Sequence, residues 1–286
     1  MPPAPTSTRT WRCPVSCVNT SATVADAALV PYLQFPALAA LPGLVHGVFT
    51  RAGGVSEAPY ASLNVSLAVG DERERVQENR RRIAAALGAD PSAVFGARQV
   101  HGAAWRAVGA HETPAATERE PYDILLTSTP GHLLLLKFAD CTPLILWDPR
   151  RRWVAVAHAG WRGTAQDVAG TAVRALAAAA GTRPADLWAG IGPAIGACCY
   201  EVGPEVVAAV ERAVPNAAAI VRPSSGGRAY LDLEAANRQQ LVAAGVPPAQ
   251  VAAAARCTCC DPATFYSHRA LGLPAGRFGV AAGVRA

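Results

Sequence analysis

Short apolar runs bounded by turn-forming residues recur along the chain from about residue 44 onward. Runs of this length are typical of strands that are buried on one or both faces. Several of the runs are apolar at every position, which favours burial on both faces. We expect strands at 44–50, 94–101, 124–127, 132–138, 144–147, 153–158, 187–192 and 277–284.

Helical periodicity appears between these runs. Asp71 with Glu74 three positions later gives a capping-box pattern, an apolar stripe follows, and Gly88 marks the end of the helix. We expect three further helices, at about 164–180, 204–213 and 233–244. Because strands and helices alternate without a fixed-period repeat, we expect an α+β fold with α/β alternation: one mixed-sheet sandwich with flanking helices.

The first residues differ from the rest of the chain. Residues 1–28 are rich in Thr, Ser, Pro and Ala and lack periodicity, which predicts a disordered N-terminal extension. Residues 29–286 are expected to form one catalytic domain, long enough to bury a sizeable core. The start lacks the apolar stretch of a secretory signal, and no run is long enough to span a membrane, so we expect a cytoplasmic protein without a membrane partner.

Positive charge is carried almost entirely by arginine. The net charge is +5, and Lys137 is the only lysine. The arginine runs 80–82 and 150–152 have no interleaved aromatic residues of the kind that stack on bases. We therefore interpret them as solvated faces and expect no nucleic-acid partner.

Three residues that bind soft metal ions each lie where an expected strand gives way to a turn. They are His101 in Arg-Gln-Val-His-Gly, Cys141 in Ala-Asp-Cys-Thr-Pro and His158 in Ala-His-Ala-Gly-Trp-Arg-Gly. Strand ends of an open α/β sheet are where ligands gather. Two imidazoles and a thiolate would give zinc three protein ligands and leave one position open, as in catalytic zinc sites. The chain is therefore interpreted first as a metalloenzyme.

Other interpretations of the same residues stay open. Taken singly, each is more often a packed histidine or a core thiol. Two histidines and a cysteine are also the trigonal copper set, but that set usually adds a methionine, and Met1 is the only one, so zinc is preferred to copper. Alternatively, Cys141 could be a nucleophile with His158 or His101 as its base. A metal-binding module without catalysis is the remaining class.

The other cysteines carry less signal. The chain has eight cysteines, which we expect to remain thiols in a reducing compartment. Cys257, Cys259 and Cys260 lack a histidine at zinc-finger spacing. We interpret them as buried thiols near Phe265 and Tyr266.

The chain resembles the laccase-domain family. The resemblance extends in order from about residue 31 to 284, and its motifs are specific in combination. They are His46-Gly-Val-Phe-Thr-Arg-Ala-Gly-Gly-Val-Ser56, Ser62-Leu-Asn64, Arg98-Gln-Val-His-Gly102, Ala139-Asp-Cys-Thr-Pro143, His158-Ala-Gly-Trp-Arg-Gly163, Cys199-Tyr-Glu-Val202, Leu231-Asp-Leu233 and Cys257-Thr-Cys-Cys260. Members of this family were once named multicopper polyphenol oxidases and are now described as purine nucleoside phosphorylases.

The resemblance implies a sandwich-like α+β fold and a zinc ion held by His101, Cys141 and His158. It also implies phosphorolysis of adenosine, inosine and S-methyl-5'-thioadenosine, with adenosine deaminase activity. A Cys/His amidase or deamidase, for example in peptidoglycan-precursor editing, and a copper-dependent phenol oxidase remain the alternatives. The preferred purine and the oligomeric state stay open.

Phosphorolysis requires a phosphate site near the sugar. We expect Arg162 and Arg51, each in a Gly-containing turn, to neutralise phosphate. Asp140 is expected either to orient a ligand histidine or to cap the turn before Pro143.

Overall fold

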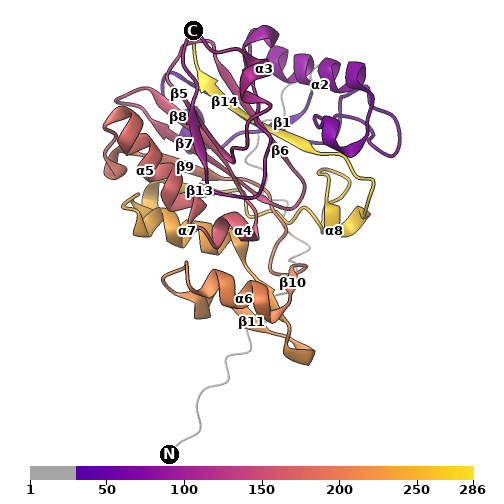
Figure 1. Ribbon diagram of the computed structural model, residues 1–286, viewed down its shortest axis with the longest axis vertical. Coiled ribbons are helices and arrows are strands. Elements are labelled where there is room, and N and C mark those ends of the chain that lie inside the picture. Colours follow the sequence, from indigo (N-terminus) through magenta and orange to yellow (C-terminus); the bar gives the residue numbers. More distant parts are fainter. Residues whose placement is uncertain (1–29) are drawn as a thin grey trace, which may run out of the picture.

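The structure, a computed structural model, describes residues 30–286. The extension predicted over 1–28 lies outside these residues. The described chain forms three sheets and eight α-helices (Figure 1). No helix in this part of the chain combines the length and the apolar character needed to cross a membrane.

Two sheets make up the body of the molecule. The first has the order β1-β2-β14-β6-β3. Its strands are β1 (Tyr32–Leu33), β2 (Leu44–Phe49), β14 (Phe278–Val284), β6 (Leu133–Phe138) and β3 (Val94–Phe95). The second has the order β13-β9-β7-β8-β5-β4. Its strands are β13 (Val251–Ala253), β9 (Trp188–Ile191), β7 (Thr142–Asp148), β8 (Trp153–Ala159), β5 (Ile124–Thr127) and β4 (Trp105–Ala107).

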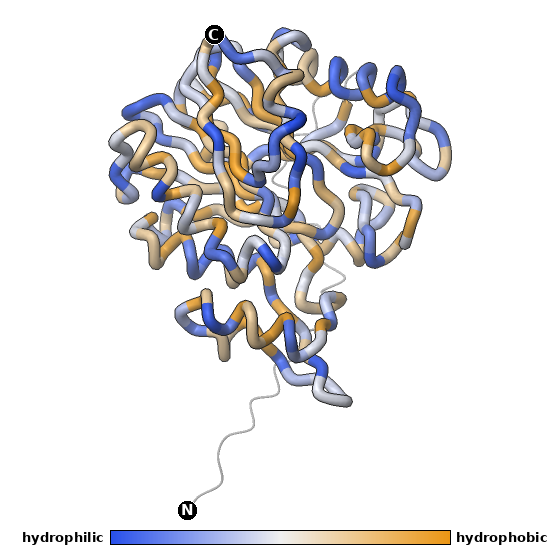
Figure 2. Tube along the Cα trace, in the orientation of Figure 1, coloured by the Kyte–Doolittle hydropathy of each residue, from blue (hydrophilic) through white to orange (hydrophobic). Residues whose placement is uncertain are grey.

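The two sheets pack face to face, and each has helices on its outer face. Strand alternation divides the apolar residues of β7 between two cores. Ile145 and Trp147 join the core between the sheets, whereas Leu144 and Leu146 join a second core under the helices. The apolar colour in Figure 2 is concentrated along these central strands. The sandwich with flanking helices that the sequence predicts is therefore confirmed.

The eight helices cover the outer faces and the loops. The longest are α2 (Arg73–Ala86), α5 (Val168–Ala180) and α7 (Leu233–Ala243). The others are α1 (Pro36–Ala39), α3 (Pro114–Thr117), α4 (Trp161–Thr164), α6 (Pro204–Glu211) and α8 (His268–Leu271). Helices α5 and α7 pack on the six-stranded sheet, and α2 packs on the five-stranded sheet through Ile83.

A third, small sheet projects from the body together with α6 (Figure 1). Its order is β10-β12-β11, with strands β10 (Glu201–Val202), β12 (Ala229–Leu231) and β11 (Val221–Pro223). Val206 and Val210 of α6 share a separate apolar core with Leu231. None of these three short strands was predicted from the sequence.

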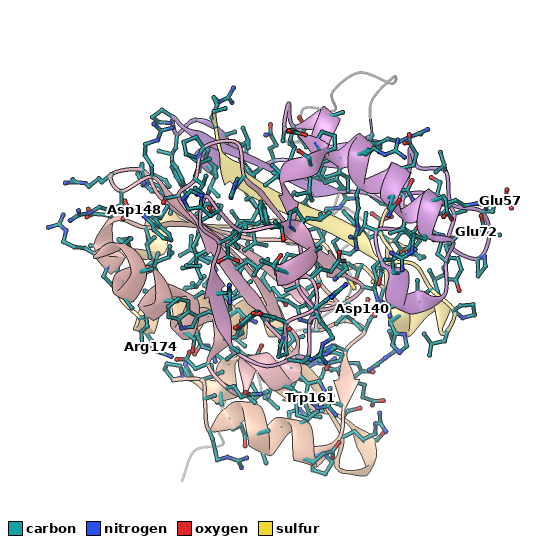
Figure 3. All side chains as sticks on the ribbon, turned by 45° about the horizontal axis from the view of Figure 1, so that its top comes forward. Glu57, Glu72, Asp140, Asp148, Trp161 and Arg174 are labelled. Carbon is teal, nitrogen blue, oxygen red and sulfur yellow. The ribbon has the colours of Figure 1, made fainter. Side chains whose placement is uncertain are left out.

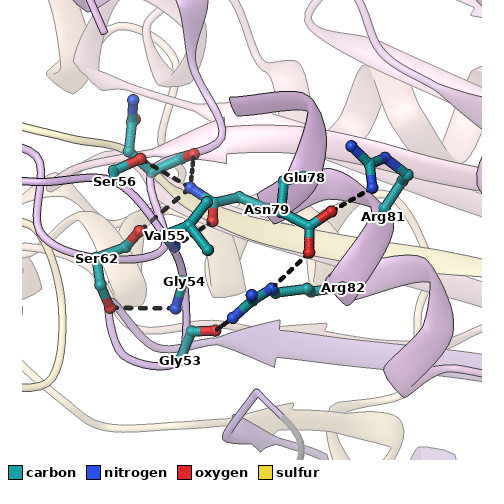
Figure 4. Close-up of polar contacts among 10 residues, drawn as sticks. Gly53, Gly54, Val55, Ser56, Ser62, Glu78, Asn79, Arg81 and Arg82 are labelled. Carbon is teal, nitrogen blue, oxygen red and sulfur yellow. Dashed lines mark hydrogen bonds and ion pairs between the residues drawn. The ribbon is translucent and has the colours of Figure 1, made fainter. Parts of the chain in front are cut away.

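Helix α2 is fastened to the loop 51–64 by a buried asparagine (Figure 4). Asn79 accepts a 2.8 Å hydrogen bond from the amide of Val55 and donates to the hydroxyl of Ser56 at 2.8 Å and to the carbonyl of Asn64 at 2.8 Å. Arg82, one turn further along, donates to the carbonyl of Gly53. Because a buried amide without partners is costly, this network fixes the position of α2 on the sheet.

In three predicted elements, a side-chain carboxylate explains the difference between the expected and the observed structure. The strand expected over 94–101 ends at Phe95, because the amides of 100–102 bind a side-chain carboxylate instead of a neighbouring strand. Asp71 does not cap α2; its carboxylate binds the side chains of Ser56 and Asn64.

The third difference concerns the helix expected over 164–180. It is split into α4 and α5, and α5 begins after Asp167. Asp167 has a left-handed backbone conformation, and its carboxylate accepts a hydrogen bond from the amide of Gly170. The side chain therefore caps a new helix instead of continuing the old one.

Candidate metal centre

The three metal-binding residues predicted from the sequence meet at one end of the sandwich. The ligand atoms of His101, Cys141 and His158 all lie within 4.8 Å of one another. His158 is near the end of β8, opposite Pro143 of the neighbouring strand β7, and Cys141 immediately precedes β7. His101 arrives from the loop after β3. Pairing of β7 with β8 thus brings together Cys141 and His158, 17 positions apart, and the loop after β3 adds His101, 40 positions before Cys141.

Strand alternation explains where His158 points. Val154 and Val156 of β8 face the core between the sheets, so His158 has the same parity and faces the same side. Its ring packs against Phe138, with centroids 5.4 Å apart, and meets His101 edge-on at 4.9 Å. His158 is buried, Cys141 is half-buried and His101 is exposed. The group therefore extends from the interior to the surface.

A buried carboxylate orients two of the three residues. Asp123 is fully buried, and its Oδ1 lies 2.8 Å from Nδ1 of His158. The same carboxylate accepts hydrogen bonds from the amides of Val100, His101 and Gly102, at 3.1, 3.1 and 2.7 Å. It therefore holds the loop of His101, where His101 has a φ of 62°. With Nδ1 engaged by Asp123, Nε2 of His158 is the nitrogen available to a metal.

Sequence reasoning missed Asp123. Instead, Asp140 was expected to orient a ligand histidine or to cap a turn. The structure places the Asp140 carboxylate against the hydroxyl of Thr258 at 2.6 Å and the amide of Arg269 at 2.7 Å. Asp140 thus joins the loop before β7 to the last part of the chain. The only available signal for Asp123 was an acidic residue directly before an apolar strand.

Neighbouring charges and hydrogen bonds stabilise the charged forms of Cys141 and His158. Burial by itself would raise the pKa of the Cys141 thiol, but the charge of His158 and hydrogen bonding from both imidazoles lower it to about 6. Burial would lower the pKa of His158, but the Cys141 charge and Asp123 raise it to about 9. Without a metal, these values give a thiolate beside an imidazolium at neutral pH. A thiolate is the form of cysteine that binds metals.

A glycine gives the centre its space. A Cβ atom on Gly160 would lie 2.9 Å from Sγ of Cys141 and 3.0 Å from Cδ2 of His101. At these distances, the added Cβ atom or its neighbour would have to move. Gly160 therefore leaves the three ligands room to approach one another.

The centre opens into a cavity of about 900 Å³. This volume lies within the usual range for small-molecule sites. The rings of Trp161 and Tyr200 line the cavity, and Figure 3 shows Asp140 toward the middle of the molecule with Trp161 below it. Basic side chains outnumber acidic ones along the wall. The basic residues are Arg80, Arg98, Lys137, Arg162, Arg269 and Arg277, and the acidic residues are Glu118 and Asp140.

The two arginines predicted to bind phosphate have different surroundings. Arg162 lines the cavity, and its guanidinium lies over the ring of Trp161, 4.3 Å from the ring centroid. Arg51 is not among the lining residues. Its guanidinium donates to the carbonyls of Ala61 at 2.9 Å and Pro262 at 2.8 Å and lies over the Tyr266 ring. The structure therefore brings Arg162 to the centre, whereas Arg51 holds two loops together.

No other histidine of the described chain joins the group of ligand atoms, although His268 lines the same cavity. His46 is fully buried, and its Nε2 accepts a 3.0 Å hydrogen bond from the amide of Phe35. His132 packs against Phe95. Residues 30–286 contain no methionine, so the axial ligand usual in trigonal copper sites has no candidate in the described chain.

A family model described as "Multi-copper polyphenol oxidoreductase laccase" matches residues 45–285. The chain belongs to this laccase-domain family. This match confirms the predicted resemblance. The matched segment includes His101, Cys141 and His158.

Named relatives of the family agree with this assignment. "Purine nucleoside phosphorylase YlmD" of Geobacillus stearothermophilus is 42% identical over 233 residues, covering 79% of this chain and 85% of the relative. "Adenosine deaminase RL5", from an unknown prokaryotic organism, is 38% identical over 226 residues, covering 76% and 85%. The crystal structure of YlmD from G. stearothermophilus matches with a TM-score of 0.85 and 39% identity, covering 92% of this chain and 99% of that one. These relatives support an enzyme of this type.

Proposed function

We propose that the protein is a zinc-dependent purine nucleoside phosphorylase that acts on adenosine, inosine and S-methyl-5'-thioadenosine and also deaminates adenosine. The observation that carries this proposal is the convergence of two imidazoles and a thiolate at the end of a cavity with basic walls. The names of the relatives support the choice of reaction, and the geometry of the cavity supports the choice of residues.

The donor set fits zinc. Two histidine nitrogens and one cysteine sulfur are ordinary zinc ligands, and three protein ligands are typical of catalytic sites. The Asp123 carboxylate on His158 is the kind of partner that metal-binding histidines usually have. When bound, zinc would lower the pKa of water toward roughly 7, which is the chemistry that hydrolytic deamination at adenine C6 needs.

Phosphorolysis uses other features of the cavity. A phosphate oxygen forms a bond to ribose C1', the bond from C1' to the purine nitrogen breaks, and the purine leaves with the electron pair and takes up a proton. Arg162 can neutralise phosphate with its planar donors. Trp161 and Tyr200 offer flat apolar surfaces for the purine. Lys137, whose pKa is lowered by burial to about 8, adds positive charge at neutral pH.

The test is incubation with adenosine, with and without phosphate. Adenine and ribose 1-phosphate support the phosphorylase, and inosine supports the deaminase. The Cys141→Ser variant is the control, because it removes one ligand at nearly unchanged side-chain volume. If neither product forms with zinc-loaded protein, the proposal is wrong.

A Cys/His hydrolase is the second candidate, favoured by the aligned Asp123, His158 and Cys141 and by the lowered thiol pKa. Chelator-treated protein separates the two. Amide hydrolysis that persists without metal supports this candidate, whereas nucleoside turnover that needs zinc supports the first. Oxidation of a phenol by copper-loaded protein would instead support the reaction in the description of the family model.

A further inference from the structure

Two loops next to the cavity bring four more thiols together. Cys198 and Cys199 lie in the loop between β9 and β10, and Cys257 and Cys260 follow β13. Their Sγ atoms all lie within 4.8 Å of one another. From the sequence, Cys257, Cys259 and Cys260 were interpreted as buried thiols. In the structure Cys260 is exposed, and the pairing of Ala194 with Cys257 joins the two loops.

The distances suit a shared cation. Sγ of Cys260 lies 3.5 Å from Sγ of Cys198 and 3.4 Å from Sγ of Cys199. Four sulfurs about 2.3 Å from one zinc ion in a tetrahedron are separated by roughly 3.8 Å. A disulfide would instead bring two sulfurs to about 2.05 Å. The sulfurs lie too close together to surround a multi-iron cluster, whose irons and sulfides occupy the space between the cysteines.

The surroundings of the thiols are those of metal ligands. The amide of Gly196 donates to Sγ of Cys257 at 3.2 Å. A divalent cation bound by the four sulfurs would balance the charge of the thiolates that bind it. Cys257 and Cys260 also have the C-x-x-C spacing common in structural zinc sites.

We propose that Cys198, Cys199, Cys257 and Cys260 bind a second, structural zinc ion. The site is closed by four sulfur ligands, so the ion takes no part in the reaction.

The second ion would fasten the wall of the active cavity. Thr258, next to Cys257, donates to the carboxylate of Asp140, and Arg269 donates to the same carboxylate and to the carbonyl of Cys199. Tyr200, which lines the cavity, directly follows Cys199. Because one ion would tie both loops to this network, its loss is expected to loosen the wall and lower the melting temperature.

Metal analysis of the purified, full-length protein tests the proposal. We expect about two zinc ions per chain in the wild type, from three ligands at one site and four at the other. Cys260→Ser, at an exposed position, is expected to lose one equivalent and to melt at a lower temperature. Cys259→Ser is the control on the same turn. Its thiol is hydrogen-bonded to the Cys199 thiol but lies outside the four-sulfur group, so this variant is expected to keep both ions. Cobalt-substituted Cys141→Ser protein should show the visible bands of a tetrahedral thiolate site.

The outcomes are independent of the catalytic proposal. If Cys141→Ser retains one zinc that is lost when Cys260→Ser is added, the second site stands whatever the enzyme catalyses. If Cys141→Ser removes all zinc, the second site does not exist. If the mass of the denatured, freshly purified protein shows a disulfide among the four residues, the second zinc site is also overturned. Loss of zinc from Cys259→Ser would contradict the proposed set of four ligands.

Discussion

The carboxylate of Asp123 lies 2.8 Å from Nδ1 of His158, and the same carboxylate binds the backbone amides of the loop that carries His101. One buried side chain therefore sets both the ring orientation of one ligand and the position of another. Its own pKa is lowered: burial opposes ionisation, but the hydrogen bond and charge of His158 together with the amides outweigh it.

Replacing Asp123 by Asn should weaken metal binding. The amide keeps the shape but removes the charge, and its NH₂ group cannot accept the hydrogen bonds from the loop. Loss of such a partner typically costs about 10–100-fold in metal affinity. Competition with a chromogenic zinc chelator measures this change. An unchanged affinity in a folded variant would show that Asp123 does not orient the ligands.

Gly160→Ala should disrupt the centre by crowding. Its methyl group would lie 2.9 Å from Sγ of Cys141, so the ligands must move apart. We expect most of the zinc at this centre to be lost. Gly109→Ala is the control, because a Cβ there meets nothing within 4 Å. Zinc content and turnover should stay at wild-type levels in the control, and equal zinc content in both variants would contradict the crowding argument.

The thiol of Cys141 should titrate low in chelator-treated protein. Its pKa is lowered to about 6, so the thiolate fraction rises through that pH and is nearly complete at pH 8. Alkylation of the Cys141 peptide by iodoacetamide, followed by mass spectrometry, should reach half its maximal rate near the same pH. A rate that still rises steeply above pH 8 would indicate an ordinary thiol.

Buried His46 should make the fold sensitive to acid. Burial lowers its pKa from 6.5 to about 4, so the neutral ring is preferred in the folded state. Above pH 6.5 neither state is protonated and stability is unaffected by His46. As the pH falls from 6.5 to 4, the unfolded chain takes up the proton first, and roughly 3 kcal/mol is lost.

Urea unfolding of the wild type and of His46→Gln, at pH 7 and at pH 4, measures this loss in the free energy of unfolding. Glutamine can still accept the hydrogen bond from Phe35 but does not titrate. The variant should therefore lose less stability on acidification. Equal losses in the two proteins would mean that His46 is not the group responsible.

The two arginines predicted for phosphate should behave differently. Arg162→Ala is expected to raise the KM for phosphate about tenfold or more, as for a lost charge-assisted hydrogen bond. Arg51→Ala should instead lower the melting temperature, since it removes donors to the carbonyls of Ala61 and Pro262. Steady-state kinetics and thermal unfolding of both variants make the comparison. If only Arg51→Ala raised the KM for phosphate, Arg51 and not Arg162 would be the phosphate-binding residue.

The sequence was most informative where apolar periodicity was strong. The bounds of β5 were predicted to the residue, and β6 to β9 and β14 to within two residues at each end, because these short runs are apolar at almost every position and are buried on both faces. The grouping of His101, Cys141 and His158 was expected because each was predicted to stand at a strand end. Pairing of β7 with β8 brings Cys141 and His158 together, whereas the strand before His101 ends at Phe95 and Asp123 holds the loop that follows.

What the sequence did not predict depends on contacts between distant segments. Asp123 is a common residue whose role appears only when the loop of His101 folds over it. Cys198 and Cys257 are 59 positions apart, and the pairing of β9 with β13, continued by the bridge at Ala194, brings their loops together. Arg51 was expected to bind phosphate because of its glycine-rich neighbours, but it does not line the cavity, and the carbonyls of Ala61 and Pro262 accept hydrogen bonds from its guanidinium.

The hairpin of β7 and β8 has its ligands at one end and its turn, residues 149–152, at the other. Seven residues at about 3.4 Å each separate the ends by roughly 24 Å. Arg151 and Arg152 in the turn are exposed. A fluorophore, affinity tag or inserted peptide placed in this turn would therefore lie far from the candidate metal centre, which is at the opposite end of the same two strands.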